Sequence, residues 1–322
     1  MTQPTTTTLQ NLSIPNRQAG WFHPGGNARD QFLLSLDLLE MEMATDSFQF
    51  NRADSIPTIT FLARSATKSL PATNVTLLSS LFQRIGEHIE LDSYDSISGR
   101  MSNNLDMQAR GVKIGLLRQL STQIIEGVAA PNIIGLKALS GSYTIGANNN
   151  NANGGFMSLQ DIYKALYFCS PSDDYLGGGA ADCAILNSKT LRELLGLLNA
   201  TSHSDGGKWV YNEKLGAPVF NYLGIDWYVN DFIPLNETKG TGTNLTSIYF
   251  VKLKGPTGLK LVYARDPQIE DVDRFGIHTY PIPIDQTQNR RGLAVEGYYT
   301  LVAPERETVS RLEGINPTQY AL

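Results

Sequence analysis

The feature that most constrains the fold is a long helical pattern in the first half of the chain. Ser102, Asn103 or Asn104 can cap the start of this helix, and Gly127 and Pro131 end it. At roughly twenty residues it would run ~30 Å. We therefore predict a helix over about 103–126 that serves as the backbone of a domain. Its apolar side chains fall on one stripe, at Leu105, Ala109, Val112, Leu116, Leu120 and Ile124.

The residues before this helix predict an arm followed by a projecting hairpin. Residues 1–45 are polar at first and then apolar over 32–43, a pattern typical of an extended arm with one short helix. Beyond them, Phe48 and Phe50 alternate with polar neighbours, and 59–62 and 75–78 are β-rich runs on either side of a polar tip. We expect a long hairpin.

The residues after the helix predict short helices first and mostly strands in the last third of the chain. The asparagine-rich run 148–155 predicts a flexible loop, and Ser158 with Asp161 forms a capping-box pattern that begins the next helix. Strands and helices are segregated, which indicates the α+β class. A buried strand at 184–186 leads into a helix at 191–198, and later strands are expected at 219–222, 225–229, 247–253, 259–263, 277–282 and 293–302.

The charge and the cysteines exclude several classes of protein. Only 18% of residues are charged, against 41% that are hydrophobic, which favours a chain that buries much of its surface on copies of itself. The net charge is −5 and no basic stripe occurs, so we do not expect tight binding of nucleic acid through its phosphates to be the role of this protein. Cys169 and Cys183 are too few for a disulfide scaffold and are predicted to be reduced, semi-buried thiols.

Candidate chemical motifs fail on geometry. Gly177–Gly179 precedes a strand rather than a helix, so it is not a phosphate loop. His203, Ser204 and Asp205 are adjacent, whereas a hydrolase triad draws on distant segments. We predict no catalytic, cofactor or metal site, because the remaining acidic pairs and the four histidines lack ligand spacing: Asp173-Asp174, Asp271 with Asp273, His23, His88, His203 and His278.

The ends and the hydropathy of the chain indicate no membrane role. The threonine-rich start has neither a positive region nor an apolar core, so no secretory signal is expected. No apolar stretch approaches the ~18 residues that a membrane span needs. We expect a protein that is made and used in a cytoplasm.

Three segments of the carboxyl half together resemble the major capsid proteins of tailed phages, the Hong Kong 97-type fold that encapsulins share. The resemblance extends in element order over nearly the whole chain and is carried jointly, since each motif alone is weakly specific. It implies a non-enzymatic subunit of the icosahedral head. The segments are the strand-to-helix unit 184–194, the run 222–229 closing at Phe232-Ile233-Pro234, and the run 291–299 that continues through Val302-Ala303-Pro304 to Arg311-Leu312.

The resemblance also implies an organisation and partners. The domains would be an N-terminal arm (1–45), an extended hairpin loop (46–97), a peripheral domain (98–169 and 256–322) and an axial domain (170–255). Copies would form pentamers and hexamers in a virion assembled in the host cytoplasm. Portal protein, a cement protein and non-specifically contacted double-stranded DNA are further expected partners. Scaffolding is either a separate protein or a segment that has been removed.

Two alternatives stay open. One is an encapsulin-type compartment around a cargo enzyme, which the contents of the particle would distinguish from a virus. The other is a hydrolase that uses His203 or His278.

Some relatives cross-link a hairpin lysine to an asparagine. Lys68 lies near the predicted tip, but the sequence identifies neither its partner nor the acid required, and no cross-link is predicted.

Overall fold

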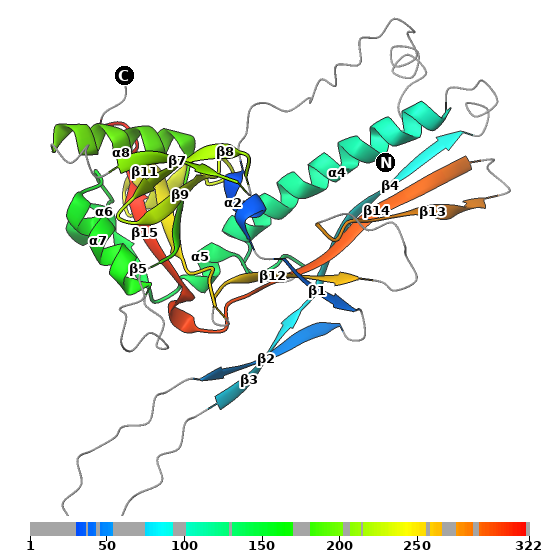
Figure 1. The fold of residues 1–322 in the computed structure, drawn as a ribbon, viewed down its shortest axis with the longest axis horizontal. Coiled ribbons are helices and arrows are strands. Elements are labelled where there is room, and N and C mark those ends of the chain that lie inside the picture. The colour runs from blue at the N-terminus through cyan, green and yellow to red at the C-terminus, as the bar shows by residue number, and fades with distance from the viewer. Residues whose placement is uncertain are drawn as a thin grey trace, which may run out of the picture.

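Two sheets and one long helix dominate the computed structural model (Figure 1). The wide end of the molecule holds an eight-stranded sheet with helices on it, and a second sheet and the long helix extend away from this end. The structure describes residues 30–36, 38–42, 46–53, 75–92, 101–128, 131–169, 181–201, 207–213, 215–255, 258–265, 275–285 and 290–319.

The described elements confirm the α+β class. The helices are α2 (Gln31–Ser35), α4 (Met101–Glu126), α5 (Leu136–Leu139), α6 (Ala147–Asn150), α7 (Leu159–Phe168), α8 (Ser188–Ala200) and the 3-10 helix η2 (Arg306–Thr308). The strands are β1 (Leu38–Glu42), β2 (Ser47–Ala53), β3 (Val75–Leu81), β4 (Gln83–Asp92), β5 (Thr144–Gly146), β6 (Cys183–Leu186), β7 (Gly207–Asn212), β8 (Ala217–Tyr222), β9 (Ile225–Val229), β10 (Glu237–Lys239), β11 (Gly242–Val251), β12 (Lys260–Arg265), β13 (His278–Asp285), β14 (Arg290–Val302) and β15 (Val309–Ile315).

The long helix α4 follows the predicted stripe. Leu116, Leu120 and Ile124 are buried and pack on the five-stranded sheet. The helix stops at Gly127, whose amide donates to the Gln123 carbonyl at 2.8 Å. A Cβ on Gly127 would lie 2.0 Å from a backbone oxygen, so only glycine fits this turn.

The five-stranded sheet is organised around β14. Its strand order is β1-β12-β14-β13, and β4 pairs with β14 on the other side. Alternate residues of β14, including Val295, Tyr299 and Leu301, are buried in the same cluster as the α4 stripe. The remaining face carries polar side chains such as Glu296 and Thr300.

The middle of the eight-stranded sheet is covered on both faces. Its order is β5-β15-β11-β6-β9-β8-β7, with β10 beside β11. All four residues of β6 are buried. Because side chains alternate along a strand, Ala184 and Leu186 pack with α7 and α8, whereas Cys183 and Ile185 belong to the cluster that contains α2.

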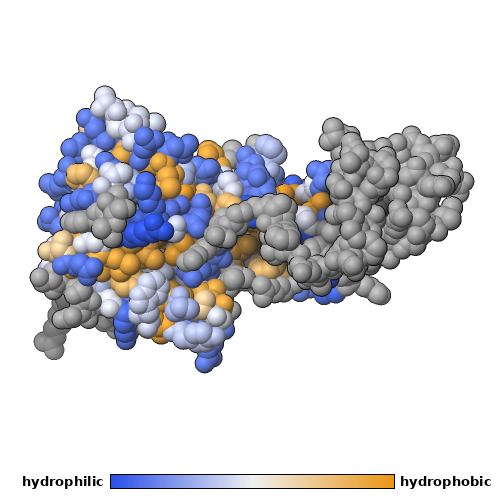
Figure 2. All heavy atoms as spheres, turned by 90° about the horizontal axis from the view of Figure 1, so that it is seen from above, coloured by the Kyte–Doolittle hydropathy of each residue, from blue (hydrophilic) through white to orange (hydrophobic). Residues whose placement is uncertain are grey.

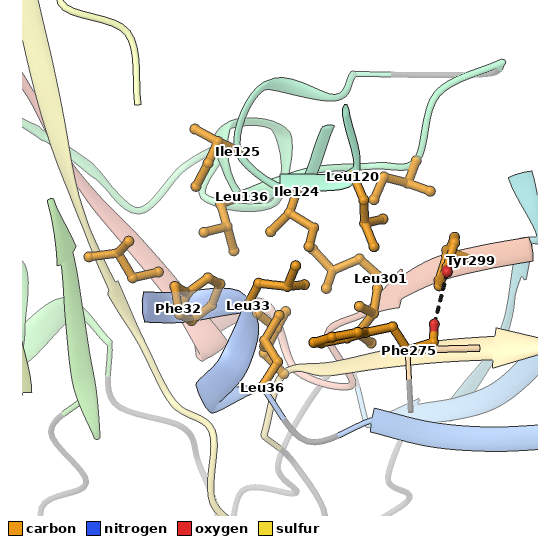
Figure 3. Packing of buried hydrophobic residues seen from close by; sticks show 14 of the residues in the cluster. Phe32, Leu33, Leu36, Leu120, Ile124, Ile125, Leu136, Phe275, Tyr299 and Leu301 are labelled. Atoms are coloured by element: carbon orange, nitrogen blue, oxygen red, sulfur yellow. Dashed lines mark hydrogen bonds between the residues drawn. The ribbon is translucent and has the colours of Figure 1, made fainter. Parts of the chain in front are cut away.

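The described part of the expected arm packs inside its own chain. Phe32, Leu33 and Leu36 are buried, and Figure 3 shows them pointing toward residues of α4 and β14. Strand β1 pairs in parallel with β12. This corrects the expectation that the arm lies along neighbours, at least over 30–36 and 38–42, because three large apolar side chains gain burial within one molecule.

The expected hairpin is divided between two locations. Strands β2 and β3 form a separate two-stranded sheet, hereafter the ribbon, while β4 joins the five-stranded sheet along β14. The predicted strand 59–62 and the tip at Lys68 lie outside the described residues. The division into four domains stays a prediction.

The asparagine-rich segment differs from the predicted loop. Asn148, Asn149 and Asn150 all have positive φ, the left-handed region that asparagine tolerates better than most residues. The buried carboxylate of Asp161 accepts hydrogen bonds from the amides of Asn148 and Asn149 at 3.0 and 3.2 Å. The segment is therefore a tightly held turn that the Asp161 carboxylate fixes, while Ser158 caps α7 by accepting a hydrogen bond from the Asp161 amide.

Candidate functional site

Of the residues that sequence analysis considered for chemistry, the structure describes His88, His278, Cys169 and Cys183. Outside the described residues lie His23, Lys68, Asp173-Asp174, Gly177–Gly179, His203–Asp205 and Asp271–Asp273. His278 is fully buried, and its Nε2 lies 3.1 Å from the carbonyl oxygen of Ala264. His88 is exposed on β4. Within the described ranges no three histidine, cysteine or acidic side chains are grouped to hold a metal.

Both cysteines are free and buried more deeply than predicted. The Cys169 thiol donates to the Thr308 carbonyl, and the Cys183 thiol lies 3.7 Å from the Val251 carbonyl. Burial raises the pKa of Cys169 to about 12, and it also raises that of Cys183. Such thiols are packing residues rather than nucleophiles.

The most unusual surface belongs to the ribbon. Strands β2 and β3 pair from Ser47 with Leu81 to Ala53 with Val75, and Figure 1 shows them leaving the body. Leu77 and Leu81 are 62% and 57% exposed on one ribbon face. A two-stranded sheet is marginal alone in water, so this one needs a surface to pack on.

The base of the ribbon is tied to the five-stranded sheet. The Phe82 amide, between β3 and β4, donates to the carbonyl of Asp46 at 3.0 Å. The hydroxyls of Ser80 and Thr300 lie 2.6 Å apart. These contacts fix where the ribbon leaves the body.

A carboxylate beside this base collects several donors. Glu296 accepts hydrogen bonds from Arg84 Nε at 2.6 Å, from the Tyr280 hydroxyl at 2.6 Å and from the Tyr298 hydroxyl at 3.0 Å. Burial alone would raise the pKa of Glu296, but the two tyrosines and Arg84 outweigh it and hold the pKa below the ordinary value. The hydrogen bond to Glu296 in turn raises the pKa of Tyr280 to about 12. Sequence reasoning missed this cluster, because Arg84 and Glu296 are 212 positions apart.

Exposed apolar side chains also occur away from the ribbon. Figure 2 shows hydrophobic residues reaching the surface in a broken band across the wide end of the molecule. Trp209 and Tyr211 of β7 are 57% and 65% exposed. No described helix is both long and apolar enough to cross a bilayer. The exposed Trp209 and Tyr211 offer an apolar area suited to protein contacts.

Comparison with solved structures gives full-length matches. The chain is similar to the structure described as the holo-SrpI encapsulin complex from Synechococcus elongatus PCC 7942, with 11% identity, a TM-score of 0.71, and coverage of 100% of this chain and 99% of the other. It is also similar to a structure from Mycobacterium phage Ogopogo, with 13% identity, a TM-score of 0.59, and coverage of 97% and 99%. A third similar structure is the capsid of a native GTA particle, with 11% identity, a TM-score of 0.59, and coverage of 98% and 99%.

The chain has the Hong Kong 97-type capsid fold. The resemblance read from the carboxyl half is thereby confirmed at the level of the fold. No protein-family model matches the sequence. No curated protein matches it either. At 11–13% identity overall sequence similarity to these structures is low, and the shared fold shows most clearly in the structure.

Proposed function

We propose that this chain is a self-assembling shell subunit, and specifically the major capsid protein of a tailed phage. The observation that carries the proposal is the ribbon, which leaves the body with Leu77 and Leu81 exposed on one face. Because a neighbouring copy supplies the missing packing surface, the subunit is completed only by assembly. The capsid fold supports this role, which is structural and not catalytic.

The partners follow from the same proposal. Copies associate as pentamers and hexamers around double-stranded DNA, in a virion formed in the host cytoplasm. A scaffolding protein, a portal and a cement protein complete the head. DNA contact is non-specific, in keeping with a net charge of −5 and the lack of a basic stripe.

An encapsulin-type compartment is the second candidate. The similarity to the encapsulin structure favours it, because its TM-score of 0.71 exceeds the 0.59 of the phage structure. Both candidates share the shell and differ in its contents. Particles purified from the native source should contain double-stranded DNA and carry a tail in the first case, and a packed cargo enzyme without a tail in the second.

The shell itself is tested by expressing the chain and imaging it by negative-stain electron microscopy. We expect large particles with icosahedral symmetry. Replacing Leu77 and Leu81 together by serine should abolish the particles, while Val128→Ser, a matched change at a site 67% exposed, should leave them intact. A wild-type chain that remains a small, stable oligomer at micromolar concentration, with no tendency to assemble, would contradict the proposal.

A further inference from the structure

The last strand of the eight-stranded sheet leaves large apolar side chains uncovered. Strand β7 pairs with β8, and no described strand pairs with its other edge. Trp209 is 57% exposed, Val210 39% and Tyr211 65%. Because neighbours along a strand point to opposite faces, β7 is open on both faces and along its edge. Such a strand is a template for contact with another chain.

An acidic cleft lies beside this strand. Its volume is about 440 Å³, and it lies between the end of α2 and the β7–β8 hairpin. Among the described residues that line it, three are carboxylates, Asp182, Glu213 and Asp226, and Lys254 is the basic one. The Lys254 side chain is 85% exposed, 3.7 Å from Asp182, and neutralises little of this charge. The cleft suits a cationic group.

The same chain carries a basic surface elsewhere. Lys189 and Arg192 are exposed one turn apart on α8, and neither forms an ion pair with a described carboxylate. Lys189 also lies in the first turn of the helix, where the positive end of the helix dipole disfavours a cation. A carboxylate from a partner would supply the missing ion pair and would offset the unfavourable interaction of Lys189 with the helix dipole. Four other cations with partly exposed side chains pair with carboxylates, namely Arg84, Lys137, Lys254 and Arg265. Lys164 and Lys208 are also exposed without a carboxylate partner among the described residues, but they are single cations and do not form a pair on one helix as Lys189 and Arg192 do.

We propose that β7 and its acidic cleft bind the Lys189–Arg192 surface of α8 on a second copy of the chain. The proposal rests on the proposed function and names the surfaces through which copies meet. The two patches differ, so the contact is heterologous and repeats from copy to copy, which forms a ring where the rotation between copies closes. Trp209 and Tyr211 supply apolar area at the contact, and the charges select its register.

Charge reversal tests this contact directly. Glu213→Lys alone, or Lys189→Glu with Arg192→Glu, places like charges together and should lower the particle yield at least about tenfold. The triple variant restores opposite charges and should recover most of the wild-type yield. Glu87→Lys, the same charge change on the exposed part of β4, should leave the yield unchanged. Melting temperatures of the variants show whether each one folds.

The outcomes separate this contact from the proposed function. Wild-type particles together with a triple variant that folds but stays unassembled would overturn the contact alone. Unchanged particle yield in the single and double reversals would overturn it as well. A wild-type chain that remains monomeric overturns both the contact and the shell function. As a second measurement, Trp209→Ala with Tyr211→Ser should also reduce assembly in a chain that still folds.

Discussion

Glu296 of β14 accepts a hydrogen bond of 2.6 Å from Arg84 of β4, across the strand pair that continues the ribbon into the body. The contact joins residues that the sequence separates by 212 positions. It lies close to the point where Ser80 meets Thr300. The strand pair into which the ribbon continues is therefore held by a charged hydrogen-bond cluster as well as by sheet pairing.

Replacing Glu296 by glutamine should lower the free energy of unfolding by about 1–3 kcal/mol, because the tyrosine and arginine donors lose a charged acceptor. The folded pKa lies below the ordinary 4.5, so this contribution is complete above about pH 4.5 and is lost as the pH falls through the folded value. The difference in melting temperature between wild type and variant should narrow in acid. A difference that stays constant below pH 4.5, or that Glu87→Gln reproduces, would contradict the assignment.

Replacing Phe32 by alanine should cost about 3–5 kcal/mol of unfolding free energy, as for other fully buried aromatic residues. Phe32 is 0% exposed between the two sheets. Denaturant unfolding of the unassembled chain measures the loss. Leu77→Ala, at a ribbon position 62% exposed, is the control and should change it by less than about 0.5 kcal/mol. Equal effects would mean that α2 is not part of the core.

Replacing Asp161 by asparagine should destabilise the chain by about 1–3 kcal/mol, because one amide oxygen cannot accept from Ser158, Asn148 and Asn149 as the carboxylate does. Urea unfolding measures this change. Gln160→Ala, one residue earlier on the exposed side of α7, is the matched control. If Asp161→Asn left the free energy of unfolding unchanged, the asparagine turn would be stable without the Asp161 carboxylate.

The two thiols should resist labelling in the folded protein. Cys169 and Cys183 are 0% and 1% exposed, and burial raises the pKa of Cys169 to about 12. At pH 8 a thiol reagent should therefore modify neither cysteine until denaturant unfolds the chain. Mass spectrometry counts the labels. Fast modification of the native protein would show that one of these sites opens.

Local signals predicted the elements, and long-range pairing determined their places. Residues of the α4 stripe and the capping pair Ser158 and Asp161 behave as expected, because the interactions that define them lie within a few turns. The sequence did not predict β7, whose exposed Trp209 and Tyr211 lack the alternation of a half-buried strand. The sequence also did not predict that β4 pairs with β14 and not within the ribbon. No local pattern in 83–92 indicates a pairing partner near the other end of the chain. The cleft beside β7 combines segments that only the fold brings together.

The continuity of β3 with β4 has a mechanical consequence. Phe82 alone separates the two strands, and they lie roughly in line in Figure 1. A pull on the ribbon is therefore directed along β4, parallel to its seam with β14. Ten residue pairs from Gln83 to Asp92 must slide at once, instead of parting one after another. Force on the ribbon would be transmitted directly to the middle of the sheet. The β4–β14 pairing would then break in one step, at a high force.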